Sequence, residues 1–481
     1  MKSDKICIVG GGTAGWMTAA TFAYFFPHKE ISLIESPDVP TIGVGESTTQ
    51  FFSDWLKNIE IQDHEWMDEC NATYKYSVRF ENWNEAEPFH FPFTDMQEVT
   101  GHFGIANKLD IINWFIHKTL TDCPVDTFAQ FYCPHYKSIV ENRIITKSFD
   151  RYDKDVYKGY QIDATKFADW LRRNRCQKVN HIIEHVDRSI LNTFDADIFV
   201  DCTGFRRVLS DLYTTNSEWE SFSDELPNDR AWTVRLPYTD KRKEMVVYTN
   251  CHALDNGWVW TVPLRDRLGK GYNFSSRFVS DEDALEEFKA HLGYPEETLS
   301  DYKLVPYKTG LIKTPWKGNV ISIGLSGGFI EPLESNALLS VHDWVIEACK
   351  VLSLDKIRQI DINSFNREVR KQFLKIKRFV GMHYYMSTRD DTPYWRYLTQ
   401  ELDIGGPDKL PLESWTMYNL FGEGFIAAGH NYNPFDKVTL QMLHNQGRID
   451  LDPNNFNINN FSHYDDLQET FPFAVDYYDN K

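Results

Sequence analysis

Three glycines near the start of the chain have the spacing of a loop that holds a diphosphate. Gly10, Gly12 and Gly15 occupy the glycine positions of a G-x-G-x-x-G pattern. In such a loop the first glycine makes a tight turn, the second lets backbone amides approach the diphosphate, and the third lets the helix pack closely on the strand. Glu35 follows about 20 residues after Gly15, where a carboxylate can accept hydrogen bonds from a ribose. The pattern predicts a dinucleotide site, and the loop alone does not choose between FAD and NAD(P).

The segments before and after this loop have the sequence patterns of the strands and the helix that would hold it in place. The apolar run 6–9 predicts a buried strand, residues 16–26 predict a helix, and residues 31–34 predict a second strand. Strand, loop, helix, strand and acid therefore follow one another in the order of a βαβ unit. We predict that the cofactor-binding residues here are Gly10, Gly11, Gly12, Thr13, Ala14, Gly15 and Glu35.

Two later strands also run into glycines. Residues 197–200 predict a buried strand that ends in Asp201 and Gly204, which is either a second approach to the dinucleotide or an ordinary strand end. Residues 320–323 predict another strand, and a long helix should follow through residue 348. The free N–H groups at the start of that helix can hold an anion.

For two further segments, spacing alone allows both a functional and a purely structural interpretation. Lys75 lies in a predicted strand, on the face opposite Tyr74 and Tyr76, where a solvated lysine is the simpler interpretation. Residues 43–45 contain two glycines that could lie along a flat ring system or form a surface turn. Residues 51–69 predict a helix between these two segments.

Residues 232–278 alternate strongly and predict an antiparallel sheet along one side of a pocket. Trp258 and Trp260 share one face at a period of two, so their indoles should stand side by side. They could form a wall, although ordinary core packing is what spacing alone favours.

Composition excludes several classes of protein. The net charge of −19 argues against a nucleic-acid partner, because phosphate binding needs a basic face. The eight cysteines contain no C-x-x-C pair, which predicts reduced thiols in a cytoplasmic protein and no metal site. No apolar run reaches about 18 residues and the first strand follows Met1 almost directly, so we expect neither a membrane span nor a signal peptide.

Several separated stretches together resemble the flavin-dependent halogenases of the tryptophan-halogenase type. Residues 9–16 are similar to the family's FAD loop, and residues 42–46 to its flavin strap. Residues 65–83 resemble the segment that carries its catalytic lysine, and residues 257–263 its G-W-x-W-x-I-P signature, with Val262 in the Ile place. Residues 331–335 match its E-P-L-E-S motif. The resemblance covers the chain from the first strand to about Trp395.

The resemblance implies a specific chemistry. FADH2, supplied by a separate flavin reductase, would react with O2 and a halide ion to yield hypohalous acid. Lys75 would hydrogen-bond this oxidant or form an N-halamine, and Glu334 would stabilise the cationic ring and remove its proton. Trp258 and Trp260 would form a barrier between flavin and substrate. Further FAD-binding residues implied by the resemblance are Val44, Gly45, Glu46, Asp201, Gly204, Leu325 and Leu338.

The halide site is the place where the chain departs from the family. The resemblance puts halide at Ser335, Asn336 and Ala337, but the family usually has Thr-Gly at the last two positions. The Cβ of Ala337 could change this loop, so the resemblance does not give the preference among chloride, bromide and iodide.

We therefore predict an α/β fold, with an FAD-binding Rossmann-like body of the flavin monooxygenase type, an antiparallel sheet layer, and a mostly helical substrate-binding region. The body is expected in residues 1–84 and 155–350, and the substrate-binding region in residues 85–154 and 351–481. Residues 372–387 should be mostly helical, with an interruption at Gly381.

The expected activity is electrophilic halogenation of a small electron-rich arene, indole-like or phenolic. The rival functions are a flavin-dependent aromatic monooxygenase and a non-catalytic FAD-binding protein. Product mass separates the first rival, since hydroxylation adds one oxygen. The sequence leaves open whether the chain is a homo-oligomer and whether its substrate is free or carrier-bound.

Overall fold

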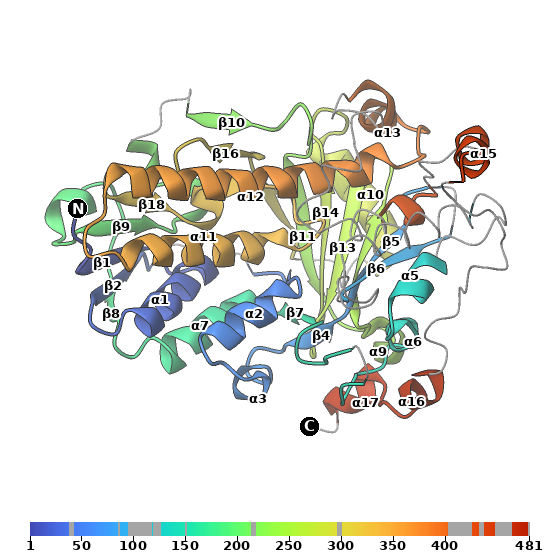
Figure 1. Cartoon of the computed structure of the whole chain (residues 1–481), viewed down its shortest axis with the longest axis horizontal. Coiled ribbons are helices and arrows are strands. Elements are labelled where there is room, and N and C mark those ends of the chain that lie inside the picture. The colour runs from blue at the N-terminus through green and yellow to red at the C-terminus, as the bar shows by residue number, and fades with distance from the viewer. Residues whose placement is uncertain are drawn as a thin grey trace. The chain divides into compact units, whose positions relative to one another are not determined.

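The computed structural model describes residues 1–37, 43–84, 87–94, 118, 127–149, 152–212, 218–295, 301–402, 426–431, 437–447 and 464–479. The chain divides into two compact units, each made of three separate segments. The first unit comprises Met1–Thr73, Tyr160–Pro237 and Leu264–Lys377, and the second comprises Tyr74–Gly159, Tyr238–Pro263 and Arg378–Lys481. Figure 1 labels the elements of both units along the chain.

A six-stranded sheet forms the centre of the first unit. Its strands, in spatial order, are β17 (Trp316–Lys317), β18 (Val320–Ser322), β9 (Ile198–Asp201), β1 (Lys5–Val9), β2 (Glu30–Glu35) and β8 (Asn180–Ile183). Every neighbouring pair is parallel except β17 and β18. Strands β1 and β9 are almost entirely buried, as expected of parallel strands covered on both faces. The four strands predicted for this part of the chain are confirmed.

Helices pack beside this sheet. Helix α1 (Thr13–Phe25) follows β1 and packs against α7 (Ala164–Asn174) and α11 (Asn336–Leu352). Asp163 caps α7, because its carboxylate accepts from the backbone N–H groups of Thr165 and Lys166. The predicted helices at residues 16–26 and through residue 348 are confirmed by α1 and α11.

Two predictions about helices are wrong. Residues 51–69 form two helices, α2 (Phe51–Asn58) and α3 (Asp63–Trp66), instead of one. Glu60, between them, has a left-handed φ of 55°, which a continuous right-handed helix cannot contain. Helix α12 (Gln359–Tyr385) confirms the helix predicted from residue 372, but it runs through Gly381 without the expected interruption. Its neighbours Val380 and Met382 are fully buried, and their packing offsets the ~1 kcal/mol that glycine costs inside a helix.

Antiparallel strands occur in both units, as predicted for residues 232–278. In the first unit β11 (Arg230–Leu236) pairs with β14 (Leu268–Phe274) and β15 (Lys303–Pro306). In the second unit β12 (Tyr248–Ala253) pairs antiparallel with β13 (Gly257–Pro263) and parallel with β5 (Ser77–Glu81), and β5 pairs with β6 (Phe89–Pro92).

The remaining elements are mostly short. The strands are β3 (Glu46–Ser47), β4 (Thr73–Lys75), β7 (Gly159–Ile162), β10 (Trp219–Ser221), β16 (Gly310–Ile312) and β19 (Gly328–Phe329). The helices are α5 (Thr127–Tyr132), α6 (Tyr136–Val140), α8 (Ile190–Thr193), α9 (Lys241–Glu244), α10 (Asp281–Leu292), α13 (Pro393–Arg396), α15 (Lys437–Asn445), α16 (Asp465–Glu469) and α17 (Ala474–Asp479), with 3-10 turns η1 (Gly204–Arg206), η2 (Ser210–Leu212) and η4 (Gly324–Ser326) and the π-helical turn η5 (Tyr397–Glu401).

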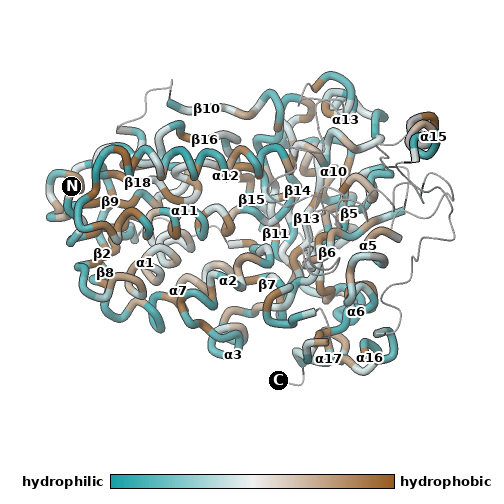
Figure 2. The backbone as a smooth tube through the Cα atoms, viewed as in Figure 1, coloured by the Kyte–Doolittle hydropathy of each residue, from teal (hydrophilic) through white to brown (hydrophobic). Residues whose placement is uncertain are grey.

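Hydropathy follows this architecture. Figure 2 shows helix α12 in alternating teal and brown bands, the pattern of a helix with one polar and one apolar face. Among the described residues, no helix has both the length and the apolar character needed to cross a bilayer.

Candidate functional site

Two glycines of the N-terminal loop, Gly10 and Gly15, lie too close to backbone atoms to carry a side chain, and Gly12 faces open space. Gly10 has a φ of +114°, and a Cβ there would lie 2.4 Å from the carbonyl oxygen of Cys202. A Cβ on Gly15 would lie 1.9 Å from the carbonyl oxygen of Gly10, so the helix can approach the loop only with glycine here. Gly12 is the N-cap of α1, and a Cβ built on it meets no described atom within 4 Å.

The start of α1 therefore fits a diphosphate. Thr13 and Ala14 lie in its first turn, where the N–H groups have no partner inside the helix. Within the described residues of α1 the first turn carries no acidic side chain, so the positive end of the helix dipole is not neutralised there. The open space beyond Gly12 leaves room for an anion.

The predicted ribose acid is at the loop. Glu35 ends β2, and its Oε2 lies only 1.4 Å from the position that a Cβ on Gly11 would take. The side chain of Glu35 thus crosses directly over Gly11. Its Oε1 lies 2.7 Å from Nε2 of His181, a residue that the sequence analysis did not single out.

The strap segment is docked on the first unit by close contacts. The guanidinium of Arg235 donates to the carbonyl oxygen of Gly43, and a Cβ on Gly43 would lie 2.4 Å from Oγ1 of Thr165. On its other side the carbonyl of Val44 lies against Gly269, where a Cβ would approach it to 2.4 Å.

The strap runs into the short strand β3. Gly45 has a φ of +140°, and Glu46 then pairs with Ile162 in β3 and β7. Burial raises the pKa of the Glu46 carboxyl to about 7.

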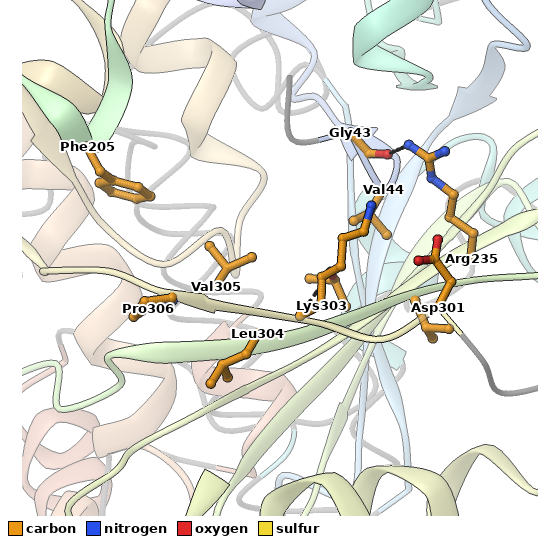
Figure 3. Close-up of a pocket in the computed structure, with 11 residues that line it drawn as sticks. Gly43, Val44, Phe205, Arg235, Asp301, Lys303, Leu304, Val305 and Pro306 are labelled. Carbon is orange, nitrogen blue, oxygen red and sulfur yellow. Dashed lines mark hydrogen bonds between the residues drawn. The ribbon is translucent and has the colours of Figure 1, made fainter. Parts of the chain in front are cut away.

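A cavity of about 540 Å³ lies beside the strap. Figure 3 shows the Arg235 guanidinium on the Gly43 carbonyl, with Phe205 and Pro306 further along the cavity. Both apolar and cationic side chains line it, which suits a flat ring with polar edges. The lining residues are Gly43, Val44, Phe205, Thr233, Val234, Arg235, Asp301, Lys303, Leu304, Val305 and Pro306.

The carboxylate of Asp201 accepts hydrogen bonds from the loop that follows β9. Its Oδ1 accepts from the backbone and hydroxyl of Thr203, and its Oδ2 accepts from the backbone N–H groups of Leu209 and Ser210 and from the Ser210 hydroxyl. Asp201 is fully buried. It therefore shapes the loop that contains Gly204, which has a left-handed φ of +65°.

Leu325 and Leu338 lie on neighbouring elements. Leu325 is in η4, which packs against α11, the helix that carries Leu338. A Cβ on Gly324 would lie 3.1 Å from the Cβ of Ala14, so this turn also touches the start of α1.

The segment that carries Glu334 is almost completely enclosed. Glu334, Ser335 and Asn336 are each no more than 3% exposed. Ser335 is the N-cap of α11 with a left-handed backbone (φ 57°, ψ 35°), a conformation that non-glycine residues rarely adopt. Asn336 and Ala337 begin the helix, so its first-turn amides belong to the residues predicted to hold halide.

Glu331, which precedes this segment, is the centre of a buried polar network that holds the segment in place. Glu331 is fully buried, and its Oε2 accepts from the side-chain amides of Asn228 and Asn273, the former at 2.7 Å. Tyr307 donates to the other end of the Asn273 amide. The Asn336 amide donates to the Glu331 carbonyl oxygen at 3.2 Å. No sequence pattern pointed to this network, because its members come from distant segments.

In the second unit, Lys75 is fully buried, so the solvated reading favoured by spacing is wrong. It ends β4, and its Nζ lies 5.0 Å from the ring centroid of Phe93, which follows β6. An aromatic face stabilises a nearby cation.

Trp258 and Trp260 lie side by side on β13, as their spacing predicts. Their ring centroids are 5.8 Å apart at 55°, and Trp258 is fully buried. The turn before β13 is held by Arg389, which donates to the Leu254 carbonyl at 3.1 Å.

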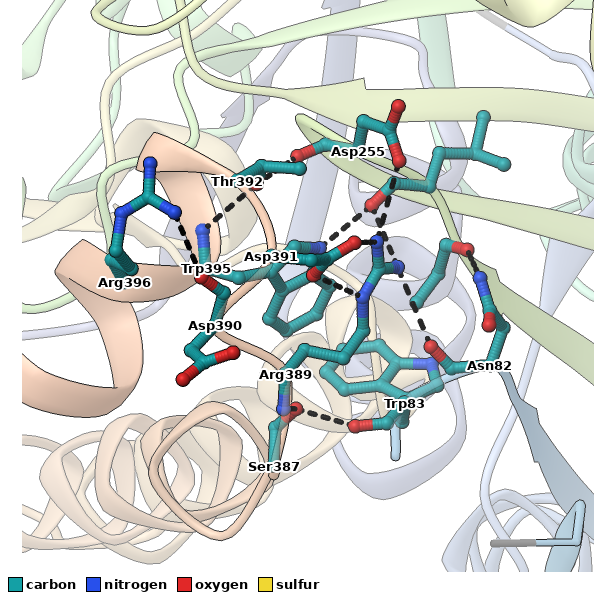
Figure 4. A network of polar contacts seen from close by, with 12 residues as sticks. Asn82, Trp83, Asp255, Ser387, Arg389, Asp390, Asp391, Thr392, Trp395 and Arg396 are labelled. Carbon is teal, nitrogen blue, oxygen red and sulfur yellow. Dashed lines mark hydrogen bonds and ion pairs between the residues drawn. The ribbon is translucent and has the colours of Figure 1, made fainter. Parts of the chain in front are cut away.

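Figure 4 shows Arg389 as the centre of a polar network in the second unit. Its guanidinium also donates to Asp391 at 2.8 Å, to Asp255 at 3.3 Å and to the carbonyl of Asn82. The guanidinium lies 4.8 Å from the ring centroid of Trp395, whose indole N–H donates to Leu254 as well. Arg389 therefore fixes the ends of three segments of this unit.

The predicted residues fall into two groups. The first unit holds the glycine loop, Glu35, the strap, Asp201, Gly204, Leu325, Leu338, Glu334 and the predicted halide residues. The second unit holds Lys75, Trp258 and Trp260.

Comparisons with known sequences agree on one family. The sequence model of the family described as tryptophan halogenase matches residues 5–415. The chain is 32% identical to tryptophan 7-halogenase RebH of Lentzea aerocolonigenes over 424 residues, which is 82% of this chain and 78% of RebH. It is 29% identical to tryptophan 6-halogenase SttH of Streptomyces toxytricini over 487 residues, 94% of this chain and 90% of SttH.

Solved structures agree with the sequence matches. The apo structure of VirX1 has a TM-score of 0.86 and 33% identity, covering 100% of this chain and 99% of VirX1. A tryptophan halogenase from Shewanella frigidimarina has a TM-score of 0.81 and 26% identity, covering 100% of this chain and 97% of that protein. The fold predicted from the sequence is thus confirmed.

Proposed function

The chain belongs to the tryptophan halogenase family of flavin-dependent halogenases, and we propose that it uses FADH2, O2 and a halide ion to halogenate a small electron-rich arene, indole-like or phenolic. The observation that carries this proposal is the complete burial of Lys75 against the ring of Phe93. A lysine excluded from water can meet a reactive halogen species without competition from bulk solvent.

We propose that FAD binds along the first unit, with its diphosphate at the start of α1 and its ribose at Glu35. The positive φ of Gly10 and the open space at Gly12 support this assignment. Bound as FADH2, the cofactor supplies the reducing equivalents with which O2, halide and a proton become hypohalous acid and water. Gly45, Glu46, Leu325 and Leu338 would line the same cofactor.

Halide would bind at the first turn of α11. The amides of Asn336 and Ala337 lie at the positive end of a 17-residue helix, next to the tight turn made by Ser335. Burial of the segment removes competing water, which strengthens the attraction of the helix end for an anion.

Lys75 would deliver the halogen. As a neutral amine it can displace water from hypohalous acid and form an N-halamine, whereas as an ammonium it can only hydrogen-bond the oxidant and orient it. In either case the arene carbon forms the new bond to halogen, and the electron pair of the broken halogen bond stays on nitrogen or oxygen.

Glu334 would complete the substitution. Its carboxylate can stabilise the cationic ring intermediate and take the ring proton, which restores aromaticity. Trp258 and Trp260, lying side by side, would keep the arene away from the flavin.

The two compact units suggest a division of labour, with the first as the FAD-binding body and the second as the substrate-binding region. We also propose a separate flavin reductase as the source of FADH2. A cytoplasmic location suits the free thiols of the described cysteines, such as buried Cys7 and Cys202.

The test is a reconstituted assay. The protein is incubated with FAD, NADH, a flavin reductase, O2 and one salt of chloride, bromide or iodide, together with a panel of indoles and phenols including tryptophan. The expected product carries one halogen, seen by mass and, for chlorine and bromine, by isotope pattern. A gain of one oxygen without halogen would instead indicate a monooxygenase. Halide-independent flavin reoxidation with no product from any arene would indicate a non-catalytic flavin-binding protein.

A further inference from the structure

The two oxygens of the Glu35 carboxylate face different partners. Oε1 lies 2.7 Å from Nε2 of His181, and Oε2 lies over Gly11 in the nucleotide loop. A carboxylate only accepts hydrogen bonds, so the His181 ring must donate its Nε2 proton to Oε1. Oε2 is thereby directed at the loop where a ribose would lie.

We propose that His181 is a positioning residue for FAD, which holds Glu35 so that one oxygen is presented to the hydroxyl groups of the adenosine ribose. The proposal rests on the FAD binding proposed above, and it goes beyond the assignment of Glu35 itself. It concerns cofactor affinity and not halogen transfer.

The sheet places the two residues on one face. Strands β2 and β8 are parallel neighbours, with Leu33 opposite His181 and Glu35 opposite Ile183. Side chains two positions apart on a strand point to the same side, so His181 and Glu35 share a face of the sheet. His181 therefore contacts Glu35 as a diagonal neighbour, two positions beyond its direct partner Leu33.

A second contact fixes the plane of the imidazole. The ring of Trp16 meets the ring of His181 edge-on, with centroids 5.0 Å apart at 77°. Trp16 directly follows Gly15 and is almost fully buried, so the nucleotide loop and its helix help to set the orientation of His181. The His181 and Glu35 side chains are each about one-quarter exposed, with 23% and 27% of their surface accessible.

The gain in affinity for FAD would come from orienting the Glu35 side chain before the cofactor binds. A glutamate side chain without a partner samples several rotamers, and fixing one of them on binding costs free energy. With Oε1 held by His181, that cost is met in the folded protein before FAD arrives. The contribution should depend on the ribose hydroxyl groups and on no other part of FAD.

The experiment measures dissociation constants of oxidised FAD, and of an analogue with a 2′,3′-dideoxyadenosine half, by flavin fluorescence. The proteins are wild type, His181→Phe, His181→Gln and His181→Asn. Gln can place its amide N–H near the position of Nε2, whereas Asn is too short and Phe has no donor. Melting temperatures of all four proteins are recorded.

We expect His181→Phe and His181→Asn to weaken FAD binding about tenfold, the size of one charge-assisted hydrogen bond. His181→Gln should remain within about threefold of wild type. The analogue should bind wild type about tenfold more weakly than FAD does, and the Phe and Asn variants should lose little further affinity for it.

Two results would overturn the proposal. One is an equal loss of affinity for FAD and for the analogue in the Phe and Asn variants, which would mark a purely structural role. The other is unchanged FAD affinity in both variants. Neither result depends on halogenation, so they leave the proposed activity standing, whereas wild-type protein that binds no FAD would defeat both proposals.

Discussion

The side-chain amide of Asn336 donates to the backbone carbonyl of Glu331, 3.2 Å away, and closes the loop that contains Glu334. The residue that departs from the family's usual Thr is therefore a structural part of that loop. It ties the first residue of α11 to the buried Glu331, and the turn between them includes the left-handed Ser335.

Removal of this tie should weaken halide binding. Asn336→Ala deletes the hydrogen bond to Glu331, and we expect the KM for halide to rise about three- to tenfold, while the FAD dissociation constant changes less than about twofold. Steady-state kinetics at varied halide concentration measure this. Ser340→Ala is the matched control, because its hydroxyl bonds the Asn336 carbonyl at 3.0 Å one turn into the helix. An equal rise in the KM of the control would contradict the specific role of Asn336.

Lys75→Met should abolish halogenated product and leave FAD binding intact. The substitution keeps a chain of similar length next to Phe93 but removes the amine that we propose carries or orients the halogen. Lys158→Met is the control, since Lys158 is also buried and its Nζ lies 5.0 Å from the ring centroid of Tyr74. Product is measured by mass spectrometry. Retained halogenation in Lys75→Met would remove this lysine from the mechanism.

The two acids of the E-P-L-E-S segment should respond differently to the same change. Glu334→Gln should lower kcat by about 10²–10⁴, as expected for loss of a general base, with little effect on the melting temperature. Glu331→Gln should cost about 1–3 kcal/mol of unfolding free energy, because a neutral amide oxygen would accept from Asn228 and Asn273 in place of Oε2 and a new NH2 group would be buried beside it. Kinetics and denaturant melts separate the roles, and wild-type rates for Glu334→Gln would contradict its assignment.

Arg389→Met should destabilise the protein by about 1–3 kcal/mol. It removes the partner of two carbonyl groups and two carboxylates, and the Arg389 side chain is only 9% exposed. Arg396→Met is the control in the same region, where one exposed hydrogen bond to the Asp390 carbonyl is lost, and we expect a loss under about 1 kcal/mol. Urea unfolding of both variants tests this. Equal losses of unfolding free energy would show that the Arg389 network contributes no more to stability than one exposed hydrogen bond.

Acid should destabilise the second unit through His135. Burial lowers the pKa of His135 to about 3, so the folded state keeps it neutral while the unfolded chain begins to bind a proton near pH 6.5. Its contribution to stability is complete above pH 6.5 and is lost as the pH falls from 6.5 toward 3, by about 2 kcal/mol at pH 5.

His135→Phe tests this pH dependence, since the ring can still pack on Tyr152, whose centroid lies 4.2 Å away. Between pH 7 and pH 5 the variant should lose about 2 kcal/mol less unfolding free energy than wild type. Parallel curves for the two proteins would show that His135 does not titrate in this way. The comparison is needed because burial raises the pKa of Glu46 and of Asp343 to about 7, and both then oppose the histidine between pH 4.5 and pH 7.

Local patterns predicted the parts of the site that local geometry determines. The glycine spacing of residues 10–15 is visible because Gly10 and Gly15 each lie against a nearby backbone carbonyl, and the strands appear as apolar runs because both faces of the sheet are covered. Glu35 is predictable for the same reason, since its place at the end of β2 follows from the length of the βαβ unit.

Contacts between distant segments could not be predicted in this way. Arg235 and Gly43 are separated by 192 positions, and His181 and Glu35 by 146, so no spacing rule joins them. For Lys75, a period of two gives the face of the strand but not what covers that face, and the covering ring of Phe93 comes from the segment after β6. The break at Glu60 and the continuity of α12 through Gly381 likewise depend on backbone conformation and tertiary packing.

The chain passes between its two compact units after Thr73, Gly159, Pro237, Pro263 and Lys377. No single cut or fusion point can therefore exchange one unit for that of a relative. Hybrid proteins that recombine the second unit of one family member with the first unit of another must transplant three stretches together. Engineers who want a new arene specificity on this scaffold are better served by substitutions within a unit than by domain swapping.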